Sequence, residues 1–321
     1  MTQIPNWLAD DYQNLIQQYD QNKLPHGLLM VGHEGNGSRE LTTSVIQYLM
    51  CTAPVAGFAC SECKSCQLLA SGSHPDFLKV IPEGKSLTIK VDAIRQLTHL
   101  VSETAQQAGN KVVYIQNAEK MNLNAANALL KVLEEPTPNT FLLMDVDELS
   151  RVLPTVRSRS RLVRLSTPSQ AQSLAWIAEQ GLDEDSALRK LSICFDQPYE
   201  AIKLTTEAEQ AWFEREKSFL NHQHFTALGK YVFSQELPVL LEQVLCWVDT
   251  SLRQRQDAGK PQQSVSSAML AELSVIPAVL LFQFRDYIVS MLKSVKNQAN
   301  LNAQLMSEQI AARWINMRGI I

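Results

Sequence analysis

The chain has 321 residues, of which 45% are hydrophobic and 19% charged, and its formal net charge is -4. This composition excludes a largely disordered chain. The acidic balance argues against a protein that grips DNA by itself with a basic surface. Single hydrophobic cores seldom grow past ~250 residues, so the length predicts two or three domains.

No membrane segment or export signal is expected. The longest strongly apolar run, residues 275–282, contains Pro277 and is far shorter than the ~20 residues that a membrane-spanning helix needs. The first residues show no basic stretch followed by an apolar one, which a signal peptide would have. We therefore expect a cytoplasmic protein without a membrane partner.

Up to about residue 165, apolar runs of strand length alternate with helix-like stretches, which is typical of an α/β domain with a mainly parallel sheet. A helix is predicted before the last of these runs, with Asn124 as its N-cap and with Pro136 and Pro138 as its stop. Its apolar face is predicted to consist of Leu129, Leu130, Val132 and Leu133. The predicted strands are residues 28–31, 77–81, 112–115 and 141–144.

After residue 168 no strand pattern returns, and the chain reads as helices through to Arg318. Gly181 is predicted to close the first of them. Residues 254–266, rich in Gln, Ser and charge, predict a loop. The last helix carries one apolar stripe, more typical of a core than of a partner surface, formed by Met306, Ile310, Trp314 and Met317. The predicted domains are residues 1–165, 166–207 and 208–321.

A glycine-rich turn, residues 32–39, follows the first predicted strand and opens a predicted helix. A phosphate-binding loop has Gly, four residues, Gly, Lys and Ser/Thr in this place, so that backbone N–H groups cradle the phosphates. Here Ser38 replaces the lysine and Arg39 replaces the hydroxyl that binds Mg²⁺. Glycine spacing alone is a weak signal, and a tight turn without a ligand is the alternative. The glycines are Gly32, Gly35 and Gly37.

The strand that ends at Ile115 is followed by two amides, Gln116 and Asn117. An ATPase of this class needs two carboxylates there, one for Mg²⁺ and one to activate water. Amides accept hydrogen bonds but cannot act as a general base. We therefore interpret the nucleotide site as vestigial and expect no ATP hydrolysis.

Four of the six cysteines are clustered, and their spacing suits four tetrahedral thiolate ligands. No histidine lies within the cluster, so a closed structural Zn²⁺ site is predicted. A redox pair is the alternative, and Cys60 and Cys63 have the spacing for it, although four clustered thiols are excessive for that role. The predicted ligands are Cys51, Cys60, Cys63 and Cys66.

Three segments resemble the clamp-loader ATPases of the AAA+ family. Residues 127–136, NALLKVLEEP, resemble their signature helix, and residues 154–160, PTVRSRS, resemble their Ser-Arg-Cys motif, with Ser160 in place of the cysteine. The four cysteines and the following HPD, residues 74–76, lie where bacterial members carry a zinc module. Matching motifs are frequent up to about residue 165. In the helical remainder the resemblance rests on the length of the chain and the order of its domains.

The resemblance implies an AAA+ domain with a parallel sheet and an inserted zinc module at 51–66, then a helical lid and an all-helical collar domain. The chain keeps the Ser-Arg motif, but its phosphate loop lacks the lysine and the Mg²⁺-binding hydroxyl. In this combination it resembles the delta-prime branch of the family and not the ATP-hydrolysing gamma/tau members. Two sensor positions also depart from the active members, with Asp145 in one place and Tyr199 in the other.

The implied setting is the DNA polymerase III holoenzyme. The implied partners are the gamma/tau and delta subunits in a hetero-pentamer and, through it, the sliding clamp and primer-template DNA.

Five arginines occur within fourteen residues that contain no acidic residue. Most of them are interpreted as a solvated basic edge. Arg159 matches the arginine finger of the family, which reaches the ATP site of a neighbouring subunit and stabilises charge on the transferred phosphoryl group. The five are Arg151, Arg157, Arg159, Arg161 and Arg164.

Two rival functions are an independent P-loop ATPase, which predicts ATP turnover by the chain alone, and a stand-alone zinc-dependent DNA-binding protein, which predicts salt-sensitive DNA affinity without partners.

Overall fold

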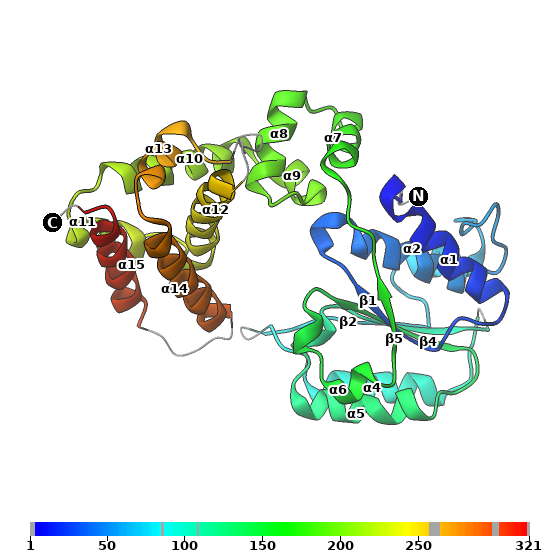
Figure 1. The fold of residues 1–321 in the computed structure, drawn as a ribbon. Coiled ribbons are helices and arrows are strands. Elements are labelled where there is room, and N and C mark those ends of the chain that lie inside the picture. The colour runs from blue at the N-terminus through cyan, green and yellow to red at the C-terminus, as the bar shows by residue number, and fades with distance from the viewer. Residues whose placement is uncertain (1–3, 85–86, 108, 257–263, 297–301, 320–321) are drawn as a thin grey trace. The chain divides into compact units, whose positions relative to one another are not determined.

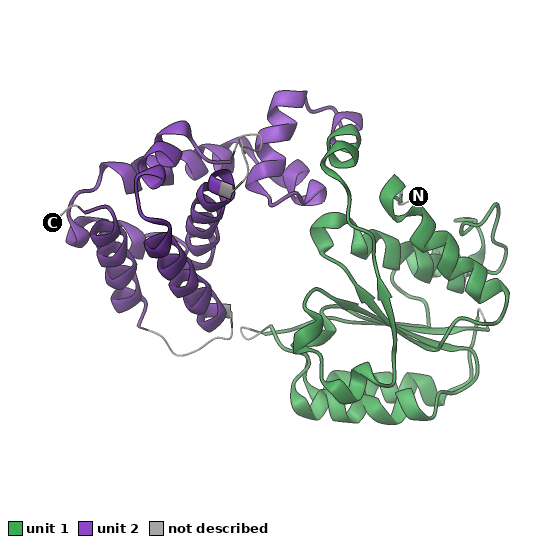
Figure 2. Ribbon diagram, in the orientation of Figure 1, with its two compact units in different colours: residues 1–176 green, residues 177–321 purple. Residues whose placement is uncertain are grey.

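The computed structural model of the chain describes residues 4–84, 87–107, 109–256, 264–296 and 302–319. It divides into two compact units, Met1–Trp176 and Ile177–Ile321 (Figure 2). Each unit has a hydrophobic core of its own. The predicted division of the helical part at residue 207 stays a prediction.

The first unit is built on a five-stranded sheet in which all neighbouring strands are parallel. Both faces of the central strands are buried because helices cover both sides of the sheet, as parallel sheets require (Figure 1). The strand order is β2-β3-β4-β1-β5. The strands are β1 (Gly27–Val31), β2 (Phe77–Val80), β3 (Lys111–Ile115), β4 (Thr140–Val146) and β5 (Arg161–Arg164).

The four predicted strands are confirmed to within one or two residues at each end, and β5 was not predicted. This edge strand is only four residues long and carries an arginine at each end, so it lacks the apolar run by which the others are recognised. It pairs with β1, and Leu29 lies opposite Leu162.

Helices α1 (Ala9–Asp20) and α2 (Ser38–Met50) cover one face of the sheet (Figure 1). The other face is covered by α4 (Val91–Ser102), α5 (Leu123–Glu134) and α6 (Pro154–Arg157). The short helix α3 (Lys64–Ala70) follows the clustered cysteines. The described residues of this unit also form four 3-10 turns: η1 (Asn6–Leu8), η2 (Glu34–Asn36), η3 (Ala118–Lys120) and η4 (Leu149–Arg151).

The predicted N-cap of α5 is wrong. The cap is Asn122, whose side-chain oxygen accepts a hydrogen bond from the backbone N–H of Ala125 at 2.8 Å. Asn124 already lies within the first turn, where its side chain cannot reach the orphan N–H groups in this way. The predicted apolar face is confirmed for three residues and is only partly buried at Leu130.

The second unit consists of helices and, within the described residues, contains no strand. Phe219, Trp247 and Trp314 meet at its centre, with ring centroids of Phe219 5.2 and 5.4 Å from those of the two tryptophans. The stripe on the last helix is buried, which confirms it as core. The helices are α7 (Gln170–Glu179, which crosses the boundary of the units), α8 (Glu184–Ile193), α9 (Pro198–Lys203), α10 (Thr206–Asn221), α11 (Phe225–Phe233), α12 (Leu237–Gln256), α13 (Ser267–Ser274), α14 (Ala278–Lys296) and α15 (Ala303–Met317).

The loop predicted at residues 254–266 begins later than expected, because α12 continues to Gln256. Residues 257–263 of this prediction lie outside the described residues, and Ser266 caps α13. In the described part of the chain no single helix is long and apolar enough to cross a membrane. Only α13 and α14 together pass that test, as a pair bent by 116°.

Candidate functional site

The glycine loop lies where β1 ends, at the carboxyl edge of the sheet, which is where parallel α/β sheets place ligands. The backbone N–H of Gly32 donates to the carbonyl of Val146 at 3.1 Å, which ties the loop to the end of β4. Gly37 adopts the left-handed conformation with φ 87° immediately before α2 begins at Ser38. The predicted strand, glycine turn and helix are therefore confirmed as local structure.

Part of the backbone of the loop is already hydrogen-bonded within the chain. The N–H of Asn36 donates to the carbonyl of His33 at 3.0 Å, and the N–H of Gly37 donates to that of Glu34 at 2.9 Å. The indole of Trp7 donates to the carbonyl of Asn36 at 2.9 Å. Two N–H groups that a phosphate-binding loop would offer to a ligand are thus already used.

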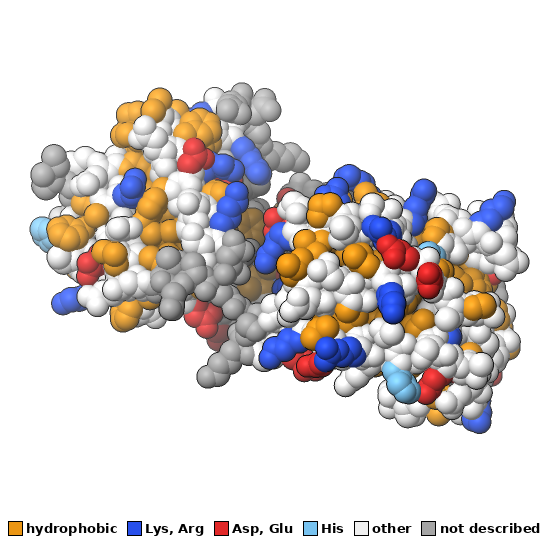
Figure 3. All heavy atoms as spheres, turned by 90° about the horizontal axis from the view of Figure 1, so that it is seen from below, with side chains coloured by type: hydrophobic (Ala, Val, Ile, Leu, Met, Phe, Trp, Pro, Cys, Tyr) orange, Lys and Arg blue, Asp and Glu red, His pale blue; other side chains and the backbone are white. Residues whose placement is uncertain are grey.

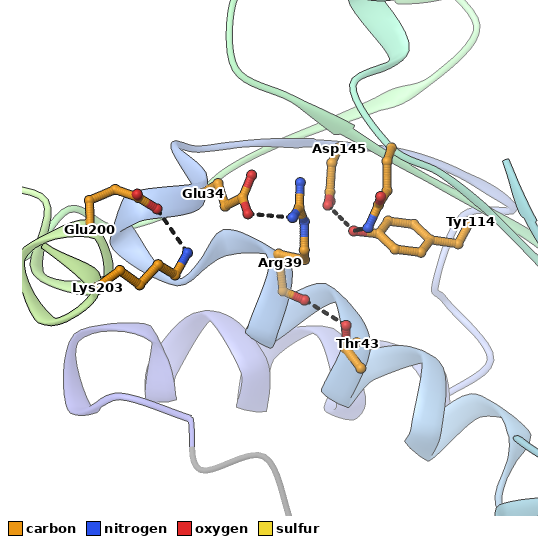
Figure 4. A network of polar contacts seen from close by, with 8 residues as sticks. Glu34, Arg39, Thr43, Tyr114, Asp145, Glu200 and Lys203 are labelled. Atoms are coloured by element: carbon orange, nitrogen blue, oxygen red, sulfur yellow. Dashed lines mark hydrogen bonds and ion pairs between the residues drawn. The ribbon is translucent and has the colours of Figure 1, made fainter. Parts of the chain in front are cut away.

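Arg39, which stands in place of the Mg²⁺-binding hydroxyl, forms an ion pair with Glu34. Both side chains are about one third exposed, at 35% and 37%. Figure 4 shows the guanidinium group of Arg39 between Glu34 and Asp145. The chain therefore carries its own cation beside the loop, close to where an ATPase would bind a metal ion.

Asp145 lies near the end of β4 and is 8% exposed. Its carboxyl group accepts hydrogen bonds from the hydroxyl of Thr42, at 2.7 Å, and from that of Tyr114. The side-chain amide of Gln116 donates to the Tyr114 hydroxyl at 3.3 Å. Burial raises the pKa of Asp145 to about 7, and it also raises the pKa of Tyr114. Asp145 thus belongs to an internal polar network, whose members Thr42 and Tyr114 no motif predicted.

The end of β3 carries no carboxylate at the two positions where an ATPase needs them. Gln116 is 7% exposed, and Asn117 adopts φ 50° at the start of η3. The next acidic residue is Glu119, which is buried, and its Oε2 has no hydrogen-bond partner in the described part of the chain. Burial raises the pKa of Glu119. No sequence motif points to Glu119, because its spacing from β3 fits no ATPase motif.

Arg159 follows α6 and presents a partly exposed guanidinium group. Its Nε donates to the carboxylate of Glu134 at 2.6 Å, and its Nη1 donates to the carbonyl of Thr155 at 3.2 Å. The hydroxyl of Ser160, which replaces the motif's cysteine, donates to the carbonyl of Val156 at 2.9 Å. The other four predicted arginines are exposed, in agreement with a solvated edge.

The four clustered cysteines are brought together, with their sulfur atoms all within 4.8 Å of one another. The sulfur of Cys51 lies 3.5 Å from that of Cys60 and 4.0 Å from that of Cys63. Four sulfurs at ~2.3 Å from a tetrahedral Zn²⁺ would lie about 3.8 Å apart, so the cluster fits a metal ion of this size. Burial raises the pKa of the Cys51 and Cys66 thiols, whereas hydrogen bonds lower the pKa of Cys63 to about 5, so holding Cys51 and Cys66 as thiolates here calls for a cation.

The family model and the curated relatives agree on one family. Residues 8–169 match the family model described as DNA polymerase III, delta subunit. The chain is 36% identical over 306 residues to DNA polymerase III subunit delta' of Pseudomonas aeruginosa, which covers 92% of this chain and 93% of that protein. The chain belongs to the DNA polymerase III delta-prime subunits.

Further delta-prime relatives match over a shorter part of the chain. The subunit delta' of Haemophilus influenzae is 35% identical over 222 residues, 68% of this chain and 66% of that protein. Among solved structures, the chain is similar to a DNA polymerase III gamma subunit-related protein from Thermotoga maritima. The TM-score is 0.48 at 22% identity, over 96% of this chain and 99% of that chain.

In this delta-prime subunit the predicted site residues form three separate groups. The glycine loop, Gln116 and Asp145 gather at one edge of the sheet, and the cysteines form a second cluster after α2. Arg159 belongs to a third group beside the end of α5, and its partner Glu134 was not predicted as a site residue. Tyr199 lies in α9 of the second unit and is partly buried.

Proposed function

We propose that the chain acts as a non-hydrolysing delta-prime subunit of the clamp loader and donates Arg159 to the ATP site of a gamma/tau neighbour. The observation that carries this proposal is the arrangement of the Arg159 guanidinium group. Its Nε and Nη1 donate to groups of this chain, while its Nη2 makes no hydrogen bond to any described residue and remains for an outside acceptor.

The chain's own loop supports the absence of hydrolysis. Arg39, which stands in place of the hydroxyl that would bind Mg²⁺ in an ATPase, is paired with Glu34, and Gln116 cannot act as a general base. No lysine is available at Ser38 to contact the β- and γ-phosphates. The site therefore lacks the catalytic groups that ATP hydrolysis needs and the lysine that would contact the phosphates.

Arg159 supports action on a neighbour's ATP. A guanidinium group is permanently charged and presents planar donors that match the oxygens of a phosphoryl group. In the transition state, charge spreads over those oxygens, and an arginine supplied by an adjacent subunit stabilises it. ATP hydrolysis at the neighbour's site would then depend on Arg159, which is not part of this chain's own glycine loop.

The remaining parts of the proposal follow from the family. The chain would assemble with gamma/tau and delta subunits in a hetero-pentamer that places the sliding clamp on primed DNA, in the cytoplasm, as part of the DNA polymerase III holoenzyme. Residues 166–207 would act as the lid and residues 208–321 as the collar domain. The cysteine cluster would hold a structural Zn²⁺, which Cys51, Cys60, Cys63 and Cys66 would bind as thiolates.

The test is the DNA-stimulated ATPase activity of the assembly reconstituted with Arg159→Ala. At the ATP site that receives Arg159, loss of an arginine finger lowers the rate by a factor on the order of 10³. The total ATPase rate should therefore fall by the fraction that this one site contributes. Arg157→Ala is the matched control, because it removes an exposed arginine two residues away and should leave the rate unchanged. Full activity with Arg159→Ala in a properly assembled complex would refute the proposal.

A further inference from the structure

Arg159 is held in place by Glu134, a residue outside the Ser-Arg motif. We infer that Glu134 is a positioning residue for the arginine finger, which it orients toward the neighbour's phosphates before a nucleotide is present. This inference rests on the proposed role of Arg159.

The hydrogen bonds of Arg159 leave one end of the guanidinium group free. Nε donates to Glu134 at 2.6 Å, and Nη1 donates to the carbonyl of Thr155 at 3.2 Å and to the hydroxyl of Ser158 at 3.3 Å. Nη2 makes no hydrogen bond to any described residue. Of the five N–H donors of the group, three are thus directed inward and two remain for an outside acceptor.

The pair is poorly suited to a purely stabilising role. The side chains of Arg159 and Glu134 are 37% and 48% exposed, and exposed ion pairs contribute little to stability. Glu134 is also the last residue of α5, where a carboxylate opposes the helix dipole. An acidic residue at this position weakens its own helix end, and its contact with Arg159 is the compensating interaction.

Both partners rest on rigid parts of the fold. The ring Nε2 of His26 lies 2.9 Å from the carbonyl of Leu133, next to Glu134, and so ties the end of α5 to the entry of β1. At Gly27, a Cβ atom would come within 2.8 Å of the Leu133 side chain, so glycine permits β1 to begin close to the end of α5. A side chain supported by fixed elements is preorganised for catalysis.

Preorganisation predicts a specific kinetic signature. Without the Glu134 carboxylate, the guanidinium group would sample several rotamers, and each turnover would have to order it again. This cost falls on the transition state, so kcat should fall while KM for ATP stays unchanged.

The experiment uses the complete assembly reconstituted with Glu134→Ala and, in parallel, with Glu134→Gln. The Arg159-dependent part of the ATPase rate, defined as the part lost with Arg159→Ala, should fall at least fivefold with Glu134→Ala. It should fall less with Glu134→Gln, whose amide oxygen still accepts a hydrogen bond without charge. Glu135→Ala is the matched control and should leave the rate unchanged, because it removes the adjacent exposed carboxylate. Thermal unfolding of the variants should match that of the unmodified chain.

The double variant Glu134→Ala/Arg159→Ala decides how Glu134 acts. It should be no slower than Arg159→Ala alone, since Glu134 has nothing left to orient. A further decrease in the double variant, or a normal or increased rate with Glu134→Ala alone, would overturn the inference and leave the proposed function standing. A normal rate with Arg159→Ala would overturn both.

Discussion

Arg39 and Asp145 show how single side chains convert a nucleotide loop into a self-contained polar cluster. Arg39 is paired with Glu34, and the Asp145 carboxyl group is buried between the hydroxyls of Thr42 and Tyr114. In an active site these positions would face Mg²⁺ and the γ-phosphate. Here Arg39 and Asp145 find partners within the chain, although the Nε of Arg39 and the Oδ1 of Asn36 are buried without a hydrogen-bond partner among the described residues.

Asp145 should make the stability of the chain depend on pH. Its folded-state pKa of about 7 lies above the ordinary value, so its contribution is present at low pH and is lost as the pH rises through about 7. The variant Asp145→Asn, which has no charge to bury, should therefore gain stability relative to the unmodified chain as the pH rises from 5 to 8. The expected gain in the free energy of unfolding is about 2 kcal/mol.

Urea unfolding of both proteins at the two pH values measures this difference. Asp147→Asn is the control, because it removes an exposed carboxylate two residues along the chain. An equal pH dependence for Asp145→Asn and the unmodified chain would show that the Asp145 carboxyl group titrates as an exposed one does.

At the scale of an element, the segment that carries the clustered cysteines is held together more by side-chain contacts than by backbone hydrogen bonds. Between the end of α2 and the start of α3 it contains only one isolated bridge, from Val55 to Phe58. Backbone N–H groups of the segment donate to cysteine sulfurs at 3.3 to 3.4 Å, an arrangement that suits thiolates bound to a metal ion.

His74 links this segment to the sheet. Its Nδ1 accepts a hydrogen bond from the N–H of Asp76 at 3.1 Å, so the proton lies on Nε2, which donates to Ser65 at 2.8 Å. Ser65 in turn donates to the carbonyl of Met50 at 2.5 Å. Burial lowers the pKa of His74, in keeping with a neutral ring. The HPD segment thus holds α3 against the end of α2 and the start of β2.

Zinc should be stoichiometric and should stabilise the first unit. We expect about one Zn²⁺ per chain, and Cys60→Ser should reduce this value well below one and lower the melting temperature by roughly 5 °C or more. Elemental analysis and thermal unfolding measure both effects, and Cys194→Ser, which removes a thiol in the second unit, should retain the metal. Less than half an equivalent of zinc in anaerobically prepared protein would rule out the structural site.

For the whole molecule, the distribution of charge bears on whether the chain could bind DNA without partners. The formal net charge is -4, and on the face shown in Figure 3 Lys and Arg side chains lie among Asp and Glu side chains. A protein that binds DNA alone concentrates positive charge on one surface. The acidic net charge therefore favours the proposed function, in which the chain reaches DNA together with its partners.

The isolated chain should neither hydrolyse ATP nor bind DNA tightly. ATP turnover should equal the background, and the Kd for primed DNA at 0.15 M salt should be no tighter than the ~1 µM of non-specific binding. Adding back the loop residues with Ser38→Lys and Arg39→Thr should not restore turnover, because Gln116 and Asn117 still supply no carboxylate. Turnover or salt-sensitive nanomolar DNA binding by the chain alone would favour one of the rival functions.

The sequence by itself determined the features that depend on neighbours along the chain. Four strands, the strand-glycine-helix turn, the spacing of the cysteines and the Ser-Arg motif around Arg159 are local patterns, so periodicity and spacing are enough to predict them. The missing lysine and carboxylates of the loop are likewise read from Ser38, Gln116 and Asn117.

Only the tertiary structure decided which distant side chains meet. Thr42 and Asp145 are 103 positions apart, Tyr114 and Asp145 are 31 apart, and Glu134 and Arg159 are 25 apart. No periodicity links such residues, because their contact depends on how the strands are ordered in the sheet and on where α5 and α6 end beside them. The short edge strand β5 is formed for the same reason, by pairing with β1 and not by an apolar pattern of its own.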